Sequence, residues 1–89
     1  MEMTYKIVYQ EHVIKKHIPA LSIAIKQLIK TAIETKLIVD PLTFGKPLRY
    51  SLKNHRRLRV SDYRVIFKIE TDAVVIIAIK HRKDIYEKF

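Results

Sequence analysis

The second half of the chain contains four strand-like runs that follow one another with almost no sequence between them. Each run is rich in β-branched, aromatic or arginine residues, and gaps of two or three residues separate them. The runs are Leu48–Leu52, Arg56–Val60, Tyr63–Glu70 and Ala73–Lys80. Because gaps this short leave room only for tight hairpins, the sequence predicts a four-stranded antiparallel meander.

The last run is apolar at both sets of alternating positions. Val74 and Ile76 would lie on one face of the strand, and Val75 and Ile77 on the other. We therefore expect this strand to be central and covered on both faces. The run is also the longest apolar stretch of the chain, far short of the ~20 residues that cross a bilayer, so no membrane contact is expected.

The first half of the chain has the patterns of one strand and two helices. Residues 5–10 are typical of a strand and residues 11–17 of a short helix, and Pro19 stands where a first helical residue is tolerated. An amphipathic helix of about 17 residues then ends near Ile38, before a proline- and glycine-containing loop at 40–47. The expected fold is α+β, with this strand and both helices packed on the meander as a single domain, residues 1–89.

The charge of the chain lies mainly in its second half. Lys and Arg number 18 in 89 residues against nine Asp and Glu, a net charge of +9, and residues 46–89 carry 12 against five, a net +7. This imbalance predicts a polyanionic partner, either nucleic acid or an acidic protein. The absence of cysteine excludes disulfides and thiol catalysis, and the single glycine excludes a glycine-rich phosphate loop. Without the pattern of a signal peptide at the first residues, we expect a cytoplasmic protein.

A basic strand face is the strongest candidate site. Arg57 and Arg59 alternate with apolar residues and share a face, and Arg64 can join them across the Ser61-Asp62 turn. Basic strand faces are usually just solvated. Here, however, the paired cations are arginines, which suit phosphate, and no acid offsets them. We therefore predict a phosphate-binding surface, with His81 and the basic residues that follow it beside it.

The remaining chemistry-bearing residues form no recognisable constellation. His12, His17 and His55 show no metal-ligand spacing with each other or with an acid. The carboxylates are scattered, and no Ser/His/Asp set is present. The expectation is a site with neither metal nor cofactor.

Three motifs resemble the RelE branch of the RelE/ParE toxin family. They are Phe44–Leu48, Arg57–Phe67 (RLRVSDYRVIF) and His81–Tyr86 (HRKDIY), and the resemblance covers the whole chain. It implies a RelE-like fold and a toxin of a type II toxin–antitoxin system that enters the ribosomal A site and cuts mRNA without metal. The implied partners are the ribosome with its mRNA and a cognate acidic, RelB-like antitoxin.

The resemblance also assigns site residues. The implied catalytic set is Arg57, Arg59, Arg64, His81, Arg82 and Tyr86. The implied RNA-binding set is Arg56, Arg57, Arg59, Arg64, Lys80, Arg82 and Lys83. The best-studied members carry lysines where this chain has the first two catalytic arginines. Because arginine holds its proton more tightly, these positions would stabilise charge rather than donate a proton.

Physical chemistry supplies a role for these residues but leaves two questions open. Attack of a 2′-hydroxyl on its neighbouring phosphate needs a base, an acid and positive charge around the developing phosphorane. Tyr86 can act as base if arginines lower its pKa, and His81 is suited by its ordinary pKa; the sequence does not choose between them. The alternatives are a ParE-like toxin of DNA gyrase and an inactive basic module that binds only an antitoxin or nucleic acid.

Overall fold

The hairpins that the short gaps require are present in the computed structural model, which describes residues 4–47 and 54–84. Strands β3 (Arg56–Val60), β4 (Tyr63–Glu70) and β5 (Ala73–His81) pair antiparallel in chain order. The first residue of each two-residue turn, Ser61 or Thr71, has a positive φ of 54° or 51°. This left-handed conformation matches the twist of the flanking strands.

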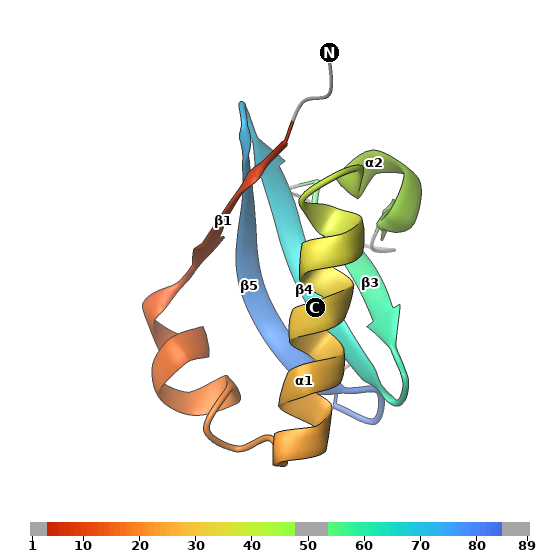
Figure 1. Ribbon diagram of the computed structural model, residues 1–89. Helices are drawn as coiled ribbons and strands as arrows, with labels where there is room; N and C mark the ends of the chain where they lie inside the picture. The colour runs from red at the N-terminus through yellow and green to blue at the C-terminus, as the bar shows by residue number, and fades with distance from the viewer. Residues whose placement is uncertain (1–3, 48–53, 85–89) are drawn as a thin grey trace.

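These strands belong to a five-stranded sheet of order β1-β5-β4-β3-β2 (Figure 1). β1 (Lys6–Tyr9) lies parallel to β5, and β2 (Lys46–Pro47) pairs antiparallel with β3. The prediction that the apolar last strand is interior is confirmed, since β5 lies between β1 and β4. The strand expected at Leu48–Leu52 lies outside the described residues.

The two predicted helices are present, with one corrected boundary. The first covers residues 11–17 and includes the π-helical turn η1 (Val13–His17). The second, α1 (Ile23–Ala32), continues as the π-helical turn η2 (Ile33–Leu37) and ends close to the expected residue. It begins after Ser22, whose hydroxyl caps it by accepting a hydrogen bond from the Ile25 amide at 3.2 Å. Pro19 therefore lies in the connecting turn and not in the helix.

The segment expected to be a plain loop at 40–47 is partly regular, which corrects the prediction. It contains the one-turn helix α2 (Pro41–Phe44), followed by β2. The Asp40 carboxylate accepts a hydrogen bond from the Thr43 amide at 3.2 Å, and the proline at the first helical position has no N–H group that would need an acceptor. A side-chain cap followed by proline is a helix-start signal that the proline and glycine content of the segment obscured.

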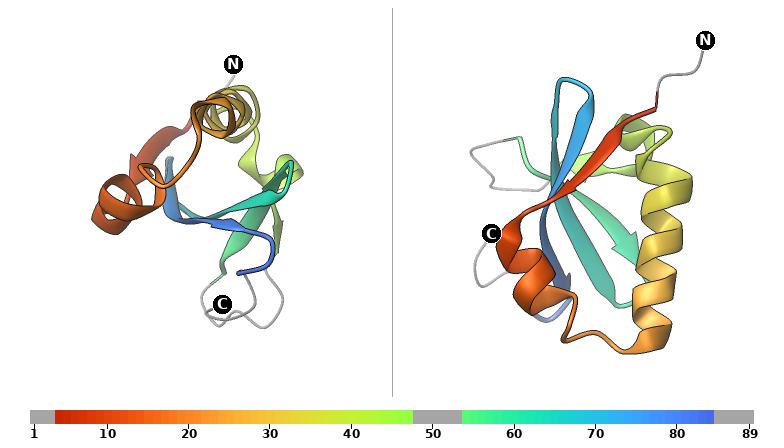
Figure 2. Two further views of the ribbon diagram at one scale, coloured as in Figure 1. Left: turned by 90° about the horizontal axis from the view of Figure 1, so that it is seen from below. Right: turned by 60° about the vertical axis from the view of Figure 1, so that its left-hand side comes forward.

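The core lies between the sheet and the helices. Figure 2 shows α1 covering one face of the sheet, with the short N-terminal helix at its β1 side. Phe67 of β4 is fully buried there, together with Ile33 of η2 and Leu58 of β3. The glycine at 45 packs directly on the Phe67 ring, because any β-carbon would meet that ring. In the described part of the chain, every helix is too short or too polar to cross a membrane.

Two histidines complete the backbone bonding of β5 where β1 stops. The pairing of β1 reaches only Ile76, next to a register irregularity in the β4–β5 ladder. Beyond it, His12 Nε2 donates to the Ile77 carbonyl at 2.6 Å, and His17 Nδ1 accepts from the Ile79 amide at 3.1 Å. Both rings are therefore part of the structure of the sheet edge.

Candidate nucleic-acid interface

Three cations form one row across strands β3, β4 and β5, next to the β3–β4 turn. In the strand register, Arg59 of β3 lies opposite Arg64 of β4, which lies opposite Lys80 of β5. Residues directly opposite one another share a face, and Leu58 on the alternate face belongs to the core beneath α1. The row therefore lies on the face turned away from α1. Like charges placed opposite one another destabilise a sheet, so an anion bound there would relieve the repulsion.

A hollow of about 420 Å³ opens beside this row, at the outer edge of β3. Its cationic lining comes from four elements, η2, β2, β3 and β4. The residues are Lys36, Lys46, Arg57, Arg59 and Arg64, and Phe44 and Leu58 complete the wall. Lys46 is present because it lies opposite Arg57 in the β2–β3 ladder. Among the residues that the structure describes, no acidic side chain lines the hollow.

Three cations of the row and hollow have no carboxylate close by within the chain's described portion. There, no carboxylate lies within ion-pair distance of Arg57, Arg59 or Lys80; the ion pairs involve other cations. Arg64 is held toward the β3–β4 turn, where its guanidinium donates to the carbonyls of Ser61 and Tyr63 at 3.1 and 2.9 Å. Arg57, Arg59 and Arg64 therefore line one hollow, as their predicted shared face requires.

Arg82 lies at the same turn, but an acid lies near it. Its backbone amide donates to the Asp62 carbonyl at 2.8 Å, and its Nε lies 3.8 Å from the Asp62 carboxylate. Both side chains are more than half exposed, so solvent weakens this pair. Arg82 therefore retains most of its capacity to attract an anion.

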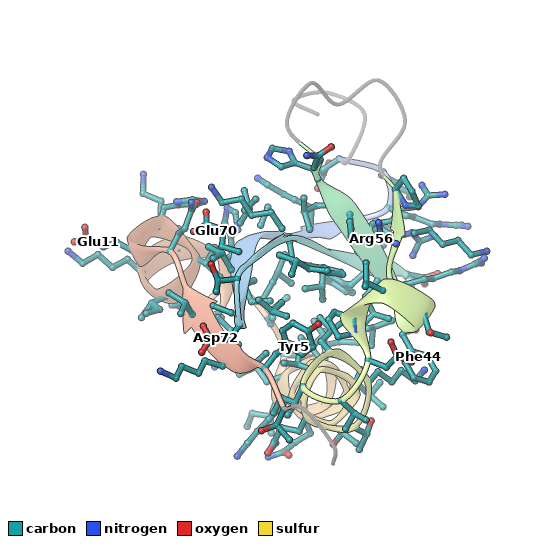
Figure 3. The ribbon with its side chains drawn as sticks, turned by 90° about the horizontal axis from the view of Figure 1, so that it is seen from above. Tyr5, Glu11, Phe44, Arg56, Glu70 and Asp72 are labelled. Atoms are coloured by element: carbon teal, nitrogen blue, oxygen red, sulfur yellow. The ribbon has the colours of Figure 1, made fainter. Side chains whose placement is uncertain are left out.

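Arg56 does not join the other arginines. It alternates with Arg57 and lies beside α2 (Figure 3). One terminal nitrogen donates to the carbonyls of Gly45 at 2.7 Å and Leu42 at 3.1 Å. Its Nε is buried and has no hydrogen-bond partner among the residues that the structure describes. This guanidinium is committed to holding the α2 segment against β3.

His81 lies away from the basic hollow. It shares the face of Ile79 on β5, and its ring packs edge-on against Tyr63 with centroids 5.3 Å apart. Its Nδ1 accepts a hydrogen bond from the Lys83 amide at 3.2 Å. With His17 and Lys80 it lines a different hollow of about 300 Å³. Tyr86 lies outside the described residues, and the side chain of Lys83 is exposed.

Within residues 4–47 and 54–84, no three His, Asp or Glu side chains lie close enough together to hold a metal ion.

The family model for the ParE toxin of the type II toxin–antitoxin system, parDE, matches residues 8–86 of the chain. The chain belongs to the RelE/ParE toxin family. The fold and the three quoted motifs thus lead to the same family as the model.

Individual relatives of this RelE/ParE-family chain agree with the assignment. Toxin RelG of Mycobacterium tuberculosis is 39% identical over 51 residues, which cover 55% of this chain and 59% of RelG. The crystal structure of the toxin–antitoxin complex RelBE2 from the same organism matches with a TM-score of 0.80 at 26% identity, covering 92% of this chain and 95% of that one. The RelB–RelE complex of Methanococcus jannaschii shares the fold, with a TM-score of 0.70 at 22% identity, over 92% and 98% of the two chains.

Apart from the buried core residue Leu58, three residues of the hollow in this RelE/ParE-family chain were absent from the sequence-based site. They are Lys36, Phe44 and Lys46. Phe44 and Lys46 stand within a family-like motif, which signals that the segment matters without assigning a role. Lys36 reaches the hollow only through the packing of η2 beside β3, and no local pattern could have linked it to Arg57.

Proposed function

We propose that this RelE/ParE-family chain is a ribosome-dependent endoribonuclease that cuts mRNA in the ribosomal A site and thereby stops translation. The observation that carries the proposal is the basic hollow lined by Arg57, Arg59 and Arg64, in which the described lining includes no acidic side chain. Arginine forks suit phosphate, and a face on which cations gather is favoured by a polyanion. The family supports a toxin function, and the nuclease activity is our inference.

The proposed reaction is an internal transfer at one phosphate. The 2′-oxygen forms a bond to phosphorus while the bond from phosphorus to the next 5′-oxygen breaks. The 2′-hydroxyl proton goes to a base, and the departing 5′-oxygen receives a proton. Arg57, Arg59 and Arg64 would stabilise the charge that grows on the phosphorane, an effect typically worth about 3 kcal/mol per donor.

We assign proton transfer to groups other than the described lining of the hollow. Among the residues that the structure describes, that lining contains neither histidine nor carboxylate, and His81 lies on the other face, against Tyr63. The position of His81 therefore favours Tyr86 as the base, and Arg82 would add a further positive charge. Because the described lining includes no acid–base pair, we propose that the ribosome orients the substrate and completes the site.

The test is cleavage in a reconstituted translation mixture, with mRNA ends mapped by primer extension. The intact protein should produce A-site cuts. Arg59→Gln should reduce their rate roughly a hundredfold, the effect of one lost donor. Lys15→Gln removes the same charge from an exposed site on η1, where Lys15 pairs with Glu11, and should cut like the wild type.

Folded protein that leaves the mRNA intact would refute the nuclease proposal. Inhibition of DNA gyrase supercoiling by that same protein would then favour the ParE-like alternative. Loss of both activities would leave a binding module. Equal cutting by the Arg59 and Lys15 variants would refute the role of the hollow while preserving the activity.

We further propose an acidic antitoxin as partner, since the RelBE2 and RelB–RelE structures are toxin–antitoxin complexes. A groove of about 650 Å³ between α1 and the end of β3 combines apolar walls, including the half-exposed Leu28, with the cations Lys36 and Arg59. Such a surface suits a segment that is both apolar and acidic. A co-expressed neighbouring acidic protein should bind and protect mRNA, and its binding should weaken with salt.

A further inference from the structure

An aromatic ring stands exposed in the wall of the basic hollow. Phe44, the last residue of α2, retains 44% of its accessible surface, and Figure 3 shows it projecting outward from that helix, away from the core. It is the aromatic residue of a lining that is otherwise cationic except for Leu58. Anion binding by the five cations does not explain why a large apolar ring is exposed beside them.

The ring is held in place by three separate contacts around α2. Asp40 caps the helix at its start. Arg56 of β3 donates hydrogen bonds to the carbonyls of Leu42 and Gly45 and so holds α2 against the strand. The ammonium of Lys36 lies 5.8 Å from the Phe44 ring centroid, within cation–π range. A pre-positioned ring costs little conformational entropy when a flat partner stacks on it.

The hollow also matches a nucleotide in size and chemistry. Its volume of about 420 Å³ lies within the range of ~300–1,000 Å³ that is typical of small-molecule sites. Arg57 and Arg59 offer forks for phosphate oxygens, while an aromatic side chain gives a nucleobase a surface on which to stack. An acidic peptide would use the cations but would gain nothing specific from the flat ring.

We infer that this hollow binds one nucleotide of single-stranded RNA, with its base stacked on Phe44 and its phosphate on Arg57 and Arg59. Phe44 is thus a substrate-binding residue that positions the RNA beside the arginine row. The inference rests on the proposed function and adds to it the contact to the base. Lys36 and Lys46 would contact the flanking phosphates.

The test uses a tryptophan placed at the stacking position. The chain contains no tryptophan, so Phe44→Trp gives a fluorophore at the hollow alone. Hexa-adenylate RNA should quench its fluorescence in a saturable way, and tripolyphosphate should displace the RNA without quenching. Ile23→Trp places the control fluorophore at the start of α1, on a side chain that is 78% exposed, and should report no quenching.

Affinity variants separate the base from the phosphate. By fluorescence anisotropy of labelled hexa-adenylate, Phe44→Leu should weaken binding about fivefold or more, the loss expected for one stacked base. It should leave the affinity for tripolyphosphate unchanged, whereas Arg57→Gln should weaken both. Melting by circular dichroism confirms that each variant is folded.

Two outcomes would overturn the inference. One is hexa-adenylate binding that neither quenches Phe44→Trp nor weakens in Phe44→Leu. The other is binding no tighter than that of a hexaglutamate peptide, which would point to carboxylates as the ligand. Either result together with A-site cutting leaves the nuclease proposal intact, while quenching by RNA without any cutting would support the hollow and refute the nuclease.

Discussion

The contact between Gly45 and the Phe67 ring gives a sharp test of how α2 is attached to the sheet. A β-carbon added at position 45 would overlap the Phe67 ring, with the Cε1 atom and the Pro41 carbonyl oxygen each only 2.9 Å away. Neither neighbour can retreat easily, because Phe67 is fully buried and the Pro41 carbonyl accepts the Gly45 amide at 3.0 Å. Overpacking of this kind typically costs about 1–3 kcal/mol.

Gly45→Ala should therefore lower the melting temperature substantially. In a domain of this size, each kcal/mol corresponds to about 4–8 °C, so a cost of ~2 kcal/mol predicts a fall of roughly 8–16 °C. Differential scanning calorimetry measures it directly. Thr43→Ala, at an exposed residue of the same helix, is the control and should shift melting little.

A double-mutant cycle identifies the ring as the cause. Phe67→Leu shortens the side chain that the new methyl group meets, so Gly45→Ala should cost at least ~0.5 kcal/mol less in the Phe67→Leu background. Strictly additive losses, or a Gly45→Ala variant that melts like the wild type, would refute the packing argument.

Three further predictions concern other contacts. Burial, reinforced by the nearby charge of Glu34, raises the pKa of Tyr9 above its usual value of 10.0. The neutral phenol is therefore favoured in the folded state. The stability that this provides is complete below pH 10 and is lost as the pH rises through the folded-state pKa. Chemical denaturation at pH 8 and pH 11 should thus show a smaller alkaline loss for Tyr9→Phe than for the wild type, and equal losses would contradict the sign. Arg56→Met should lower the unfolding free energy by about 1–3 kcal/mol, because it removes a charged donor from two carbonyls. It should leave the affinity for tripolyphosphate unchanged. Weaker tripolyphosphate binding by a stably folded variant would show that Arg56 does contact the anion. Ser22→Ala should cost about 1 kcal/mol through loss of the α1 cap, and an unchanged urea midpoint would show that the cap contributes nothing.

The hairpins could be predicted because their information is local. Gap length fixes the pairing of β3 with β4 and of β4 with β5, and pairing together with alternation places Arg57 and Arg59 on one face. The element boundaries that were predicted wrongly lie where two sequence signals compete. Pro19 suits a helix start, yet the Ser22 cap is used instead, and the proline and glycine of 40–47 concealed the cap at Asp40.

The rest of the candidate site depends on contacts distant in sequence. Lys36 joins Arg57 through helix-on-sheet packing, and Arg56 differs from its neighbour only by the direction that alternation gives it. The hydrogen bonds from Arg56 to the carbonyls of Leu42 and Gly45 could be predicted only if the packing of α2 against β3 were known. Likewise, the placement of His81 against Tyr63 follows from the register of β5, which an irregularity in the ladder shifts.

The histidine-bonded margin of β5 has a consequence for how these molecules behave when crowded together. An exposed strand margin with unused amides and carbonyls is a template on which a second chain can add, the first step of many aggregates. Here the Ile77 carbonyl and the Ile79 amide are already occupied by imidazoles from a helix. A neighbouring copy would have to displace the helix before it could dock there, which disfavours polymerisation through the most apolar strand of the protein.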